Sequence, residues 1–188
     1  MKFNTKTVHK GQKPEKLYGS VSLPIYQTST FKQNEIGEYI YDYSRAGNPT
    51  RSSLEENVCS LENGKDAVAF SSGLSAITSI VQLFSSGDHI IFTDNVYGGT
   101  FRLLDTIMKK YNIEQSWVDT SSIDQVASTI KDNTKLIFIE SPTNPMMTLS
   151  DIKGICDIAH EKNILVAVDN TFMSPYFQRP IELGADFV

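Results

Sequence analysis

The sequence predicts an α/β protein whose mostly parallel β-sheet is covered by helices on both faces. Three observations favour this class. Short apolar segments alternate with longer segments whose apolar residues recur every three or four positions, which is typical of βαβ units. The short segments are apolar throughout, as expected of parallel strands buried on both faces. The chain has 188 residues, which is enough for one such domain with a sizeable core.

The regular pattern begins near Thr50, and each later element follows from its own residues. Apolar runs predict five strands, at residues 67–71, 89–93, 116–118, 135–140 and 165–169. Helical spacing predicts five helices, at 51–61, from 73 to a point before 87, at 101–111, at 123–130 and at 149–162. Residues 184–188 predict the start of another strand. Because crossovers between parallel strands are right-handed, the carboxyl ends of the strands should share one edge of the sheet.

The first fifty residues lack any such periodicity. They are polar and rich in turn residues, and three tyrosines fall within residues 39–43. A stretch this long without clear periodicity is usually functional or packs on a partner. We therefore expect an irregular N-terminal arm at 1–50, followed by a domain at 51–188. Since the strand at 184–188 begins without finishing, we expect the chain to be the N-terminal piece of a longer protein.

Composition excludes several classes of protein. The chain carries 17 Lys and Arg against 22 Asp and Glu, and so lacks the cationic surplus that nucleic acid binding needs. The apolar run at 164–168 is far shorter than the roughly 18 residues of a membrane span, and no signal peptide pattern is present. Cys59 and Cys156 suit a reducing compartment, so we expect a cytoplasmic protein. Cys156 and His160 could face one metal ion, but two ligands do not make a site, and we predict no metal centre.

Ligands of open parallel sheets bind outside the carboxyl ends of the strands. Polar, glycine and proline residues follow the predicted strands at that edge, in the stretches 71–74, 94–100, 140–145 and 169–171. The first of these leads from a strand into a helix, where free N–H groups and the helix dipole favour an anion such as phosphate. A simple N-cap is the alternative. No G-x-G-x-x-G fingerprint occurs, which argues against a dinucleotide site.

Three side chains at this edge could complete a ligand pocket. Asp169 ends an apolar strand, where a carboxylate is costly unless paired, and it could keep a heterocyclic nitrogen protonated or act as an ordinary turn residue. Tyr97 could stack on a planar ring or belong to the core. Asn144 lies between two prolines that would aim its amide, although a plain turn residue fits as well. With the phosphate anchor, these residues predict a pocket for a phosphorylated aromatic cofactor.

Seven motifs spread over almost the whole chain point to one family. They are PIYQTSTF (24–31), YSRAGNPTR (43–51), LENG (61–64), SSGL (71–74), VYGGT (96–100), ESPTNP (140–145) and VDNTF (168–172). With these motifs the chain resembles the pyridoxal phosphate (PLP)-dependent enzymes of transsulfuration. This family comprises cystathionine γ-synthase, cystathionine γ-lyase and their β-lyase and methionine γ-lyase relatives. The resemblance implies PLP as the cofactor and the aspartate-aminotransferase-like large domain of fold type I.

The resemblance also implies a role for each matching residue around the cofactor. Gly73 and Leu74 would give backbone N–H groups to the PLP phosphate. Tyr97 would stack on the pyridine ring and assist proton transfer, and Asp169 would pair with the ring nitrogen. The remaining members of this cofactor set are Asn144, which would bond the 3-oxygen, Glu140, which would support that pocket, and Thr171.

Residues of the N-terminal arm receive roles from the same resemblance. Tyr43 and Arg45 would reach into the neighbouring subunit and hold its PLP phosphate, which implies a homo-oligomer, as a dimer of dimers. Asp42 could contact a cationic amino group of the sulfur amino-acid substrate, or it could be an exposed turn acid.

The chain lacks two residues on which the family's activity depends. The family's Schiff-base lysine falls a few residues beyond Val188, and no lysine follows Lys162. The arginine that would hold the substrate carboxylate lies in the family's C-terminal domain and is also missing. The implied activity is γ-elimination from cystathionine or γ-replacement on an activated homoserine. A β-lyase and a non-catalytic fragment are the alternatives. Gly99 stands where methionine γ-lyases typically carry cysteine, which argues against that branch.

Overall fold

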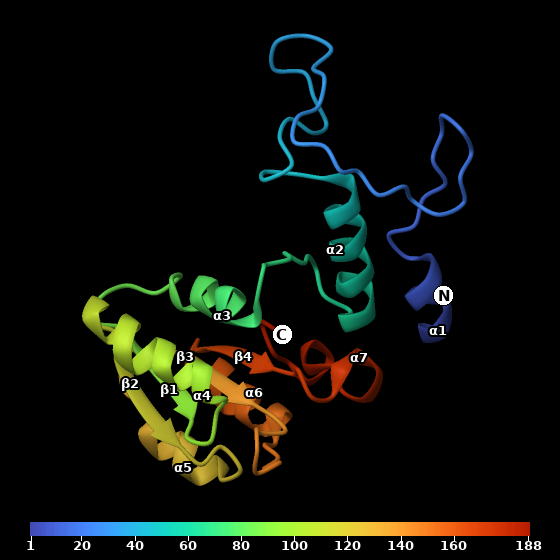
Figure 1. Cartoon of the computed structure of the whole chain (residues 1–188). Helices are drawn as coiled ribbons and strands as arrows, with labels where there is room; N and C mark the ends of the chain where they lie inside the picture. Colours follow the sequence, from blue (N-terminus) through green and yellow to red (C-terminus); the bar gives the residue numbers. More distant parts are fainter. The chain divides into compact units, whose positions relative to one another are not determined.

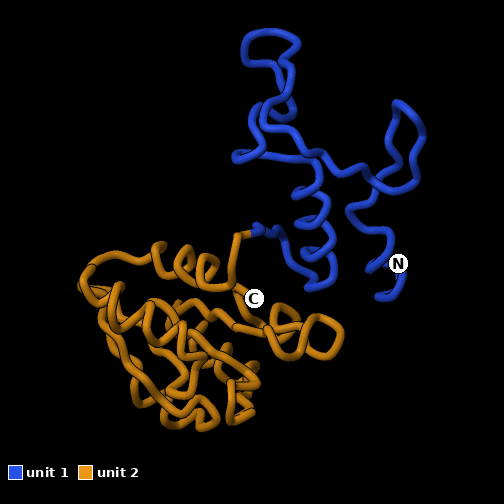
Figure 2. Tube along the Cα trace, in the orientation of Figure 1, with its two compact units in different colours: residues 1–69 blue, residues 70–188 orange.

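The computed structural model describes residues 1–188, which fall into two units, residues 1–69 and residues 70–188 (Figure 2). The centre of the second unit is a four-stranded parallel sheet in the order β2-β1-β3-β4 (Figure 1). Its strands are β1 (His89–Thr93), β2 (Glu114–Val118), β3 (Thr134–Glu140) and β4 (Leu165–Asp169). Four of the five predicted strands are thereby confirmed, each within two residues of its predicted ends. The prediction of a mostly parallel sheet is confirmed as well.

Helices cover both faces of this sheet, as the alternating pattern predicts. On one face, Ile91, Ile137 and Val166 pack with residues of α5 (Ile123–Thr129) and α6 (Ile152–His160). On the other face, Phe92 and Phe138 pack with residues of α3 (Gly73–Val81) and of the helical segment that follows β1. The sheet is therefore the middle layer of three, with apolar side chains alternating between two cores.

The helices differ from their predicted bounds in detail. The segment predicted at 101–111 is α4 (Gly98–Arg102) followed by a π-helical turn, η1 (Leu103–Ile107), and a 3₁₀ turn, η2 (Met108–Tyr111). The helix predicted at 149–162 is shorter, because the side chain of Asp151 accepts a hydrogen bond from the N–H of Gly154 and so caps α6 at its first turn. The chain then forms α7 (Ser174–Phe177) and η3 (Pro180–Leu183). No helix is both long and apolar enough to cross a bilayer.

The first unit contains two helices, α1 (Phe3–His9) and α2 (Pro49–Glu62). Helix α2 is predicted correctly. Its N-cap is Asn48, whose side chain accepts a hydrogen bond from the N–H of Thr50, and it ends at Asn63 in the left-handed conformation. The expectation of an irregular segment over 1–50 is wrong for α1. That helix buries none of its residues, so its sequence carries no apolar period to reveal it.

The prediction of a buried strand at 67–71 is also wrong. Val68 is 68% exposed and Phe70 45% exposed, and the segment pairs with no strand. The N–H of Ala69 donates instead to the Glu55 carboxylate, at 2.9 Å. An apolar run predicts burial, but a strand also needs a partner, and residues 1–188 supply none to this segment. The strand predicted at 184–188 is present only as a single parallel bridge between Phe187 and Ala167.

A buried histidine joins three strands at the amino end of the sheet. Nδ1 of His89 lies 2.7 Å from the hydroxyl oxygen of Thr134, and Nε2 lies 2.9 Å from that of Ser116. The side chain is fully buried. Burial, aided by the nearby Lys131 cation, lowers the pKa of His89 below its usual 6.5.

This lowered pKa predicts how stability depends on pH. The unfolded chain takes up a proton on His89 near pH 6.5, whereas the folded chain does so only at lower pH. The contribution of His89 to the free energy of unfolding should therefore be fully present above pH 6.5. It should fall as pH drops from 6.5 to the folded-state pKa, by about 1.4 kcal/mol for each unit by which the two pKa values differ. Urea denaturation at a series of pH values measures this slope. The His89→Gln variant should show a smaller slope, and an equal slope in both proteins would contradict the prediction.

Candidate functional site

A cavity of about 400 Å³ opens at the carboxyl ends of β1, β3 and β4. Its lining includes seven residues that the sequence analysis singles out, namely Gly73, Leu74, Tyr97, Glu140, Asn144, Asp169 and Thr171. Four further lining residues are Ser72, Ile77, Pro142 and Phe172, which the sequence analysis does not single out. The edge of the sheet where ligands are expected is thus also the place where these polar side chains meet.

One wall of the cavity is the amino end of α3. The side chain of Ser72 caps this helix by accepting a hydrogen bond from the N–H of Ser75, at 3.2 Å. The backbone N–H groups of Gly73 and Leu74 have no acceptor in the structure. A Cβ atom at Gly73 would meet nothing within 4 Å, so the space around it is open. Two free N–H groups at the positive end of a helix dipole suit an anion.

A second wall is the ring of Tyr97, at the start of α4. This ring lies directly against the backbone of Gly99, since a Cβ atom there would come within 2.4 Å of Cε1. Any side chain at position 99 would therefore push the ring away from its present place. No pattern in the sequence shows that Gly99 contacts the Tyr97 ring in this way.

We expect Gly99→Ala to displace the Tyr97 ring while leaving the fold intact, because the ring is 48% exposed and free to move. Gly98→Ala is the matched control, since its Cβ atom would meet only the end of Arg102, at 3.5 Å. A crystal structure of each variant gives the ring position, and thermal denaturation gives the stability. An unmoved ring in Gly99→Ala, or an equal shift in Gly98→Ala, would refute the seating role.

The buried carboxylate of Glu140 joins two of the loops that line the cavity. Its Oε2 accepts a hydrogen bond from the N–H of Tyr97, at 2.8 Å, and its Oε1 accepts one from the N–H of Asn144, at 2.9 Å. Burial raises the pKa of Glu140, the two N–H donors lower it, and the Asp169 carboxylate raises it further. Glu140 thus holds Tyr97 and Asn144 at a fixed spacing through their backbones.

Asp169 lies beside Glu140, because the two residues are register partners at the carboxyl ends of β3 and β4. The N–H and hydroxyl groups of Thr171 both donate to Oδ1 of Asp169. Its Oδ2 accepts no hydrogen bond in the structure and so remains available to a ligand. Two carboxylates at neighbouring strand ends favour a cationic or N–H-bearing group in the cavity.

The side chain of Asn144 also makes no hydrogen bond, although its backbone is fixed by Glu140. The Asn144–Pro145 peptide bond is cis, as is the Ser141–Pro142 bond. The amide group can therefore donate to a ligand or accept from one.

The candidate residues of the arm lie in the first unit and are not among those that line the cavity. The guanidinium carbon of Arg45 lies 5.0 Å from the centre of the Tyr43 ring, in a cation–π contact. Asp42 accepts a hydrogen bond from the side-chain amide of Gln33, at 3.1 Å.

Cys156 and His160, the two residues considered for a metal ion, lie in surroundings that do not suit one. Burial raises the pKa of the Cys156 thiol to about 11, so the thiol stays protonated and is a poor metal ligand. Nε2 of His160 lies 3.0 Å from the Asp186 carboxylate. No group of three or more potential ligands among His, Cys, Asp and Glu lies together in the structure.

Comparisons with known proteins agree with the motifs. The family model described as "Cys/Met metabolism PLP-dependent enzyme" matches residues 4–188. The chain is 49% identical to cystathionine gamma-lyase of Bacillus subtilis (strain 168), over 100% of this chain and 50% of that protein. It is 51% identical to cystathionine beta-lyase of Lactococcus lactis subsp. cremoris (strain MG1363), over 99% of this chain and 49% of that protein.

A solved structure shows the same likeness in three dimensions. The crystal structure of metB from Corynebacterium glutamicum superposes with a TM-score of 0.96 at 44% identity, covering 98% of this chain and 49% of that one. This agreement confirms the predicted fold class, the large domain of fold type I. The chain spans about half the length of the curated relatives it matches.

Proposed function

This chain belongs to the Cys/Met metabolism family of PLP-dependent enzymes, and we propose that it forms the PLP-binding part of an enzyme of transsulfuration. The substrate is cystathionine or an activated homoserine, and the reaction is γ-elimination or γ-replacement. The observation that carries this proposal is the cavity at the strand ends, where an anion-binding helix start, an aromatic ring, an amide and a free carboxylate oxygen meet.

The groups that line the cavity fit PLP in both size and chemistry. A volume of about 400 Å³ lies within the range of small-molecule and cofactor sites. The free N–H groups of Gly73 and Leu74 suit the phosphate, and Oδ2 of Asp169 suits a protonated pyridine nitrogen. When bound, PLP supplies an electron sink for negative charge that develops at the α-carbon of an amino acid.

Each residue then has a task toward the cofactor. Asp169 would hold the proton on the ring nitrogen, and Thr171 would orient Asp169 by its two hydrogen bonds to Oδ1. Tyr97 would cover one face of the ring and exclude water from it. The Asn144 amide would bond the 3-oxygen. Glu140 would act on both of the last two residues, because its two oxygens hold their backbones.

Product analysis tests the reaction. We expect the whole protein, loaded with PLP, either to convert cystathionine into cysteine, 2-oxobutyrate and ammonia or to make cystathionine from a homoserine ester and cysteine. Formation of only homocysteine, pyruvate and ammonia from cystathionine would identify a β-lyase instead. Bound PLP without turnover of any of these substrates would favour the non-catalytic alternative.

We further propose that residues 1–50 form an arm that contacts a neighbouring subunit, while residues 51–188 belong to the PLP-binding domain. The protein would then be a homo-oligomer, as a dimer of dimers, and Asp42 would meet the amino group of the substrate.

We also propose that the protein works in the cytoplasm. Both cysteines are free in the structure, which supports a place in a reducing compartment.

A mixing experiment tests the arm. In the whole protein, an Arg45→Ala variant should be nearly inactive, and so should a variant that lacks the Schiff-base lysine. If Arg45 serves the neighbouring subunit, mixed dimers contain one site with both groups intact, and activity returns to a fraction of the wild-type value. Subunit exchange is verified by mass spectrometry. Complete exchange with no recovered activity would show that Arg45 does not act across subunits.

A further inference from the structure

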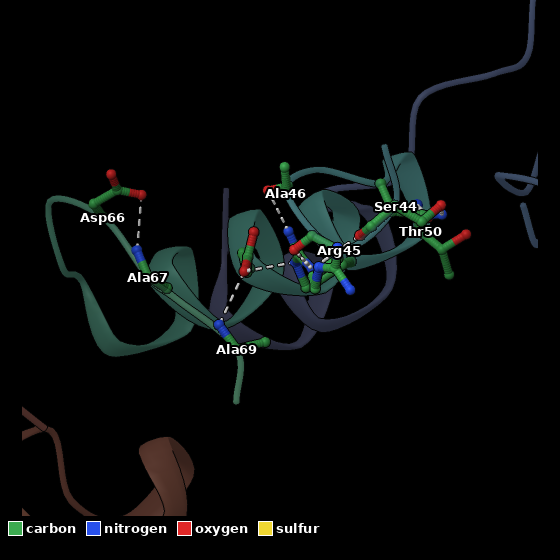
Figure 3. Close-up of polar contacts among 10 residues, drawn as sticks. Ser44, Arg45, Ala46, Thr50, Asp66, Ala67 and Ala69 are labelled. Carbon is green, nitrogen blue, oxygen red and sulfur yellow. Dashed lines mark hydrogen bonds and ion pairs between the residues drawn. The ribbon is translucent and has the colours of Figure 1, made fainter. Parts of the chain in front are cut away.

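One guanidinium group from α2 contacts several carbonyl groups of the turn that carries Tyr43 and Arg45. Nη2 of Arg51 donates to the carbonyl of Ala46, at 2.7 Å. Nη1 of Arg51 lies 3.3 Å from the carbonyl oxygens of both Ser44 and Arg45. Three successive carbonyl groups therefore converge on one cation, and Figure 3 labels the residues that carry them, Ser44, Arg45 and Ala46.

This convergence fixes the shape of the turn. The carbonyl of Tyr43 accepts hydrogen bonds from the N–H groups of Ala46 and Gly47, both at 2.9 Å, which closes the turn on itself. The three carbonyls that follow Tyr43 have Arg51 as their side-chain donor. The same turn presents Arg45 over the Tyr43 ring, at 5.0 Å. The orientation of the Tyr43–Arg45 pair therefore depends on a third residue, Arg51.

Arg51 is itself oriented by a carboxylate one helical turn away. Its Nε lies 3.5 Å from Oε1 of Glu55, and the same oxygen accepts the N–H of Ala69. In Figure 3 a dashed line joins the labelled Ala69 to this carboxylate. The side chains of Arg51 and Glu55 are 33% and 20% exposed, so solvent screens the pair less than it would a fully exposed one. The pair leaves the two terminal nitrogens of Arg51 free to face the turn.

We propose that Arg51 is a positioning residue that shapes the turn at 44–46 and so presents Tyr43 and Arg45 together to an anionic group. This inference rests on the proposed role of Tyr43 and Arg45 at the phosphate of the neighbouring subunit. Lysine cannot replace Arg51 here, because an ammonium group is a compact point charge. The planar guanidinium reaches several acceptors at once in fixed directions.

Limited proteolysis tests the shape of the turn without reference to the cofactor. Trypsin needs a locally extended backbone to cleave after Arg45, and the closed turn opposes this. In the whole protein, Arg51→Lys and Arg51→Ala should be cleaved after Arg45 about tenfold faster, as expected when charge-assisted hydrogen bonds that oppose local opening are lost. Mass spectrometry follows the Arg45–Ala46 bond separately from cuts at the lysines that precede it in the chain. Cleavage after Lys162 in the second unit serves as the internal reference and should not change.

A matched control removes a different cation that is paired with α2. Lys13 pairs with Glu56 at 3.4 Å, so Lys13→Ala removes an ion pair of that helix without touching the turn. This variant should be cleaved after Arg45 at the wild-type rate. Circular dichroism verifies that every variant keeps its helices. Equal rates of cleavage after Arg45 in wild type, Arg51→Lys and Arg51→Ala would overturn the proposal.

PLP affinity of the whole protein then connects the turn to the site. Arg51→Lys should weaken PLP binding, and adding it to Arg45→Ala should weaken binding no further, because Arg51 acts through Arg45. Full additivity of the two substitutions would contradict a positioning role. Faster cleavage in the Arg51 variants, together with unchanged PLP affinity in Arg45→Ala, would refute the phosphate role of Arg45 while the shaping of the turn stands.

Discussion

Replacing Asp169 with alanine in the whole protein is expected to lower turnover about a thousandfold, or ~4 kcal/mol of barrier, while PLP remains bound. The reason is that a pyridine nitrogen without a carboxylate partner loses its proton, and an unprotonated ring is a poor electron sink. Asp169 is placed for this task by β4, and Thr171 occupies only one of its two oxygens. The proposed phosphate contacts at Gly73 and Leu74 are left unchanged, so binding should survive.

The measurement is steady-state turnover together with the absorption spectrum of the bound cofactor. Asp157→Ala is the matched control, because it removes an exposed carboxylate of α6 that pairs only with Lys153. It should leave turnover unchanged. Near-normal turnover of Asp169→Ala would rule out the assigned role.

Glu140→Gln is expected to weaken PLP binding about ten- to a hundredfold, the effect of losing one hydrogen bond to a charged acceptor. A glutamine side chain offers one oxygen, and its NH₂ group would face the second backbone N–H group as a donor against a donor. Either Tyr97 or Asn144 would thus lose its anchor. Equilibrium dialysis of PLP against the whole protein measures the change. Glu114→Gln, at an exposed ion pair with Lys131, is the control.

The raised pKa of Glu140 adds a dependence on pH with a defined sign. Burial and the Asp169 carboxylate favour the protonated form in the folded chain, so the contribution of this group to stability is complete below its usual pKa of 4.5. It is lost as pH rises through the higher folded-state pKa. The Glu140→Gln variant has no titrating group at this position and so does not lose stability in this way. As pH rises from 4.5 through the folded-state pKa, the free energy of unfolding of wild type should fall relative to that of the variant. A rise relative to the variant would contradict the effect of burial on this pKa.

The fold and most of the cavity could be predicted because they depend on local patterns. Strands β1, β3 and β4 are apolar on both faces, and only a covered parallel sheet accounts for that. A parallel sheet brings its carboxyl ends to one edge, and this rule groups the loops that follow β1, β3 and β4. Tyr97, Asn144 and Asp169 line one cavity for that reason. Gly73 lines the same cavity although the segment before it is not a strand.

The features that escaped prediction depend on three-dimensional contacts that no pattern in the sequence reveals. Glu140 can hold two loops only because the loops after β1 and β3 leave neighbouring strands. Gly99 seats a ring two residues earlier, a contact that depends on the turn at the start of α4. The apolar residues at 67–71 predicted a strand, but a strand forms only where a neighbouring strand is available to pair with it, and this segment pairs with none.

A crystal structure of the whole protein with PLP shows directly whether the cavity at the carboxyl ends of the strands binds the cofactor. We expect the phosphate to lie within hydrogen-bond distance, about 2.7–3.2 Å, of the N–H groups of Gly73 and Leu74. The pyridine nitrogen should lie at the same distance from Oδ2 of Asp169, with the Tyr97 ring stacked on the cofactor. A cofactor bound elsewhere, or bound in the cavity with its ring nitrogen turned away from Asp169, would contradict the account.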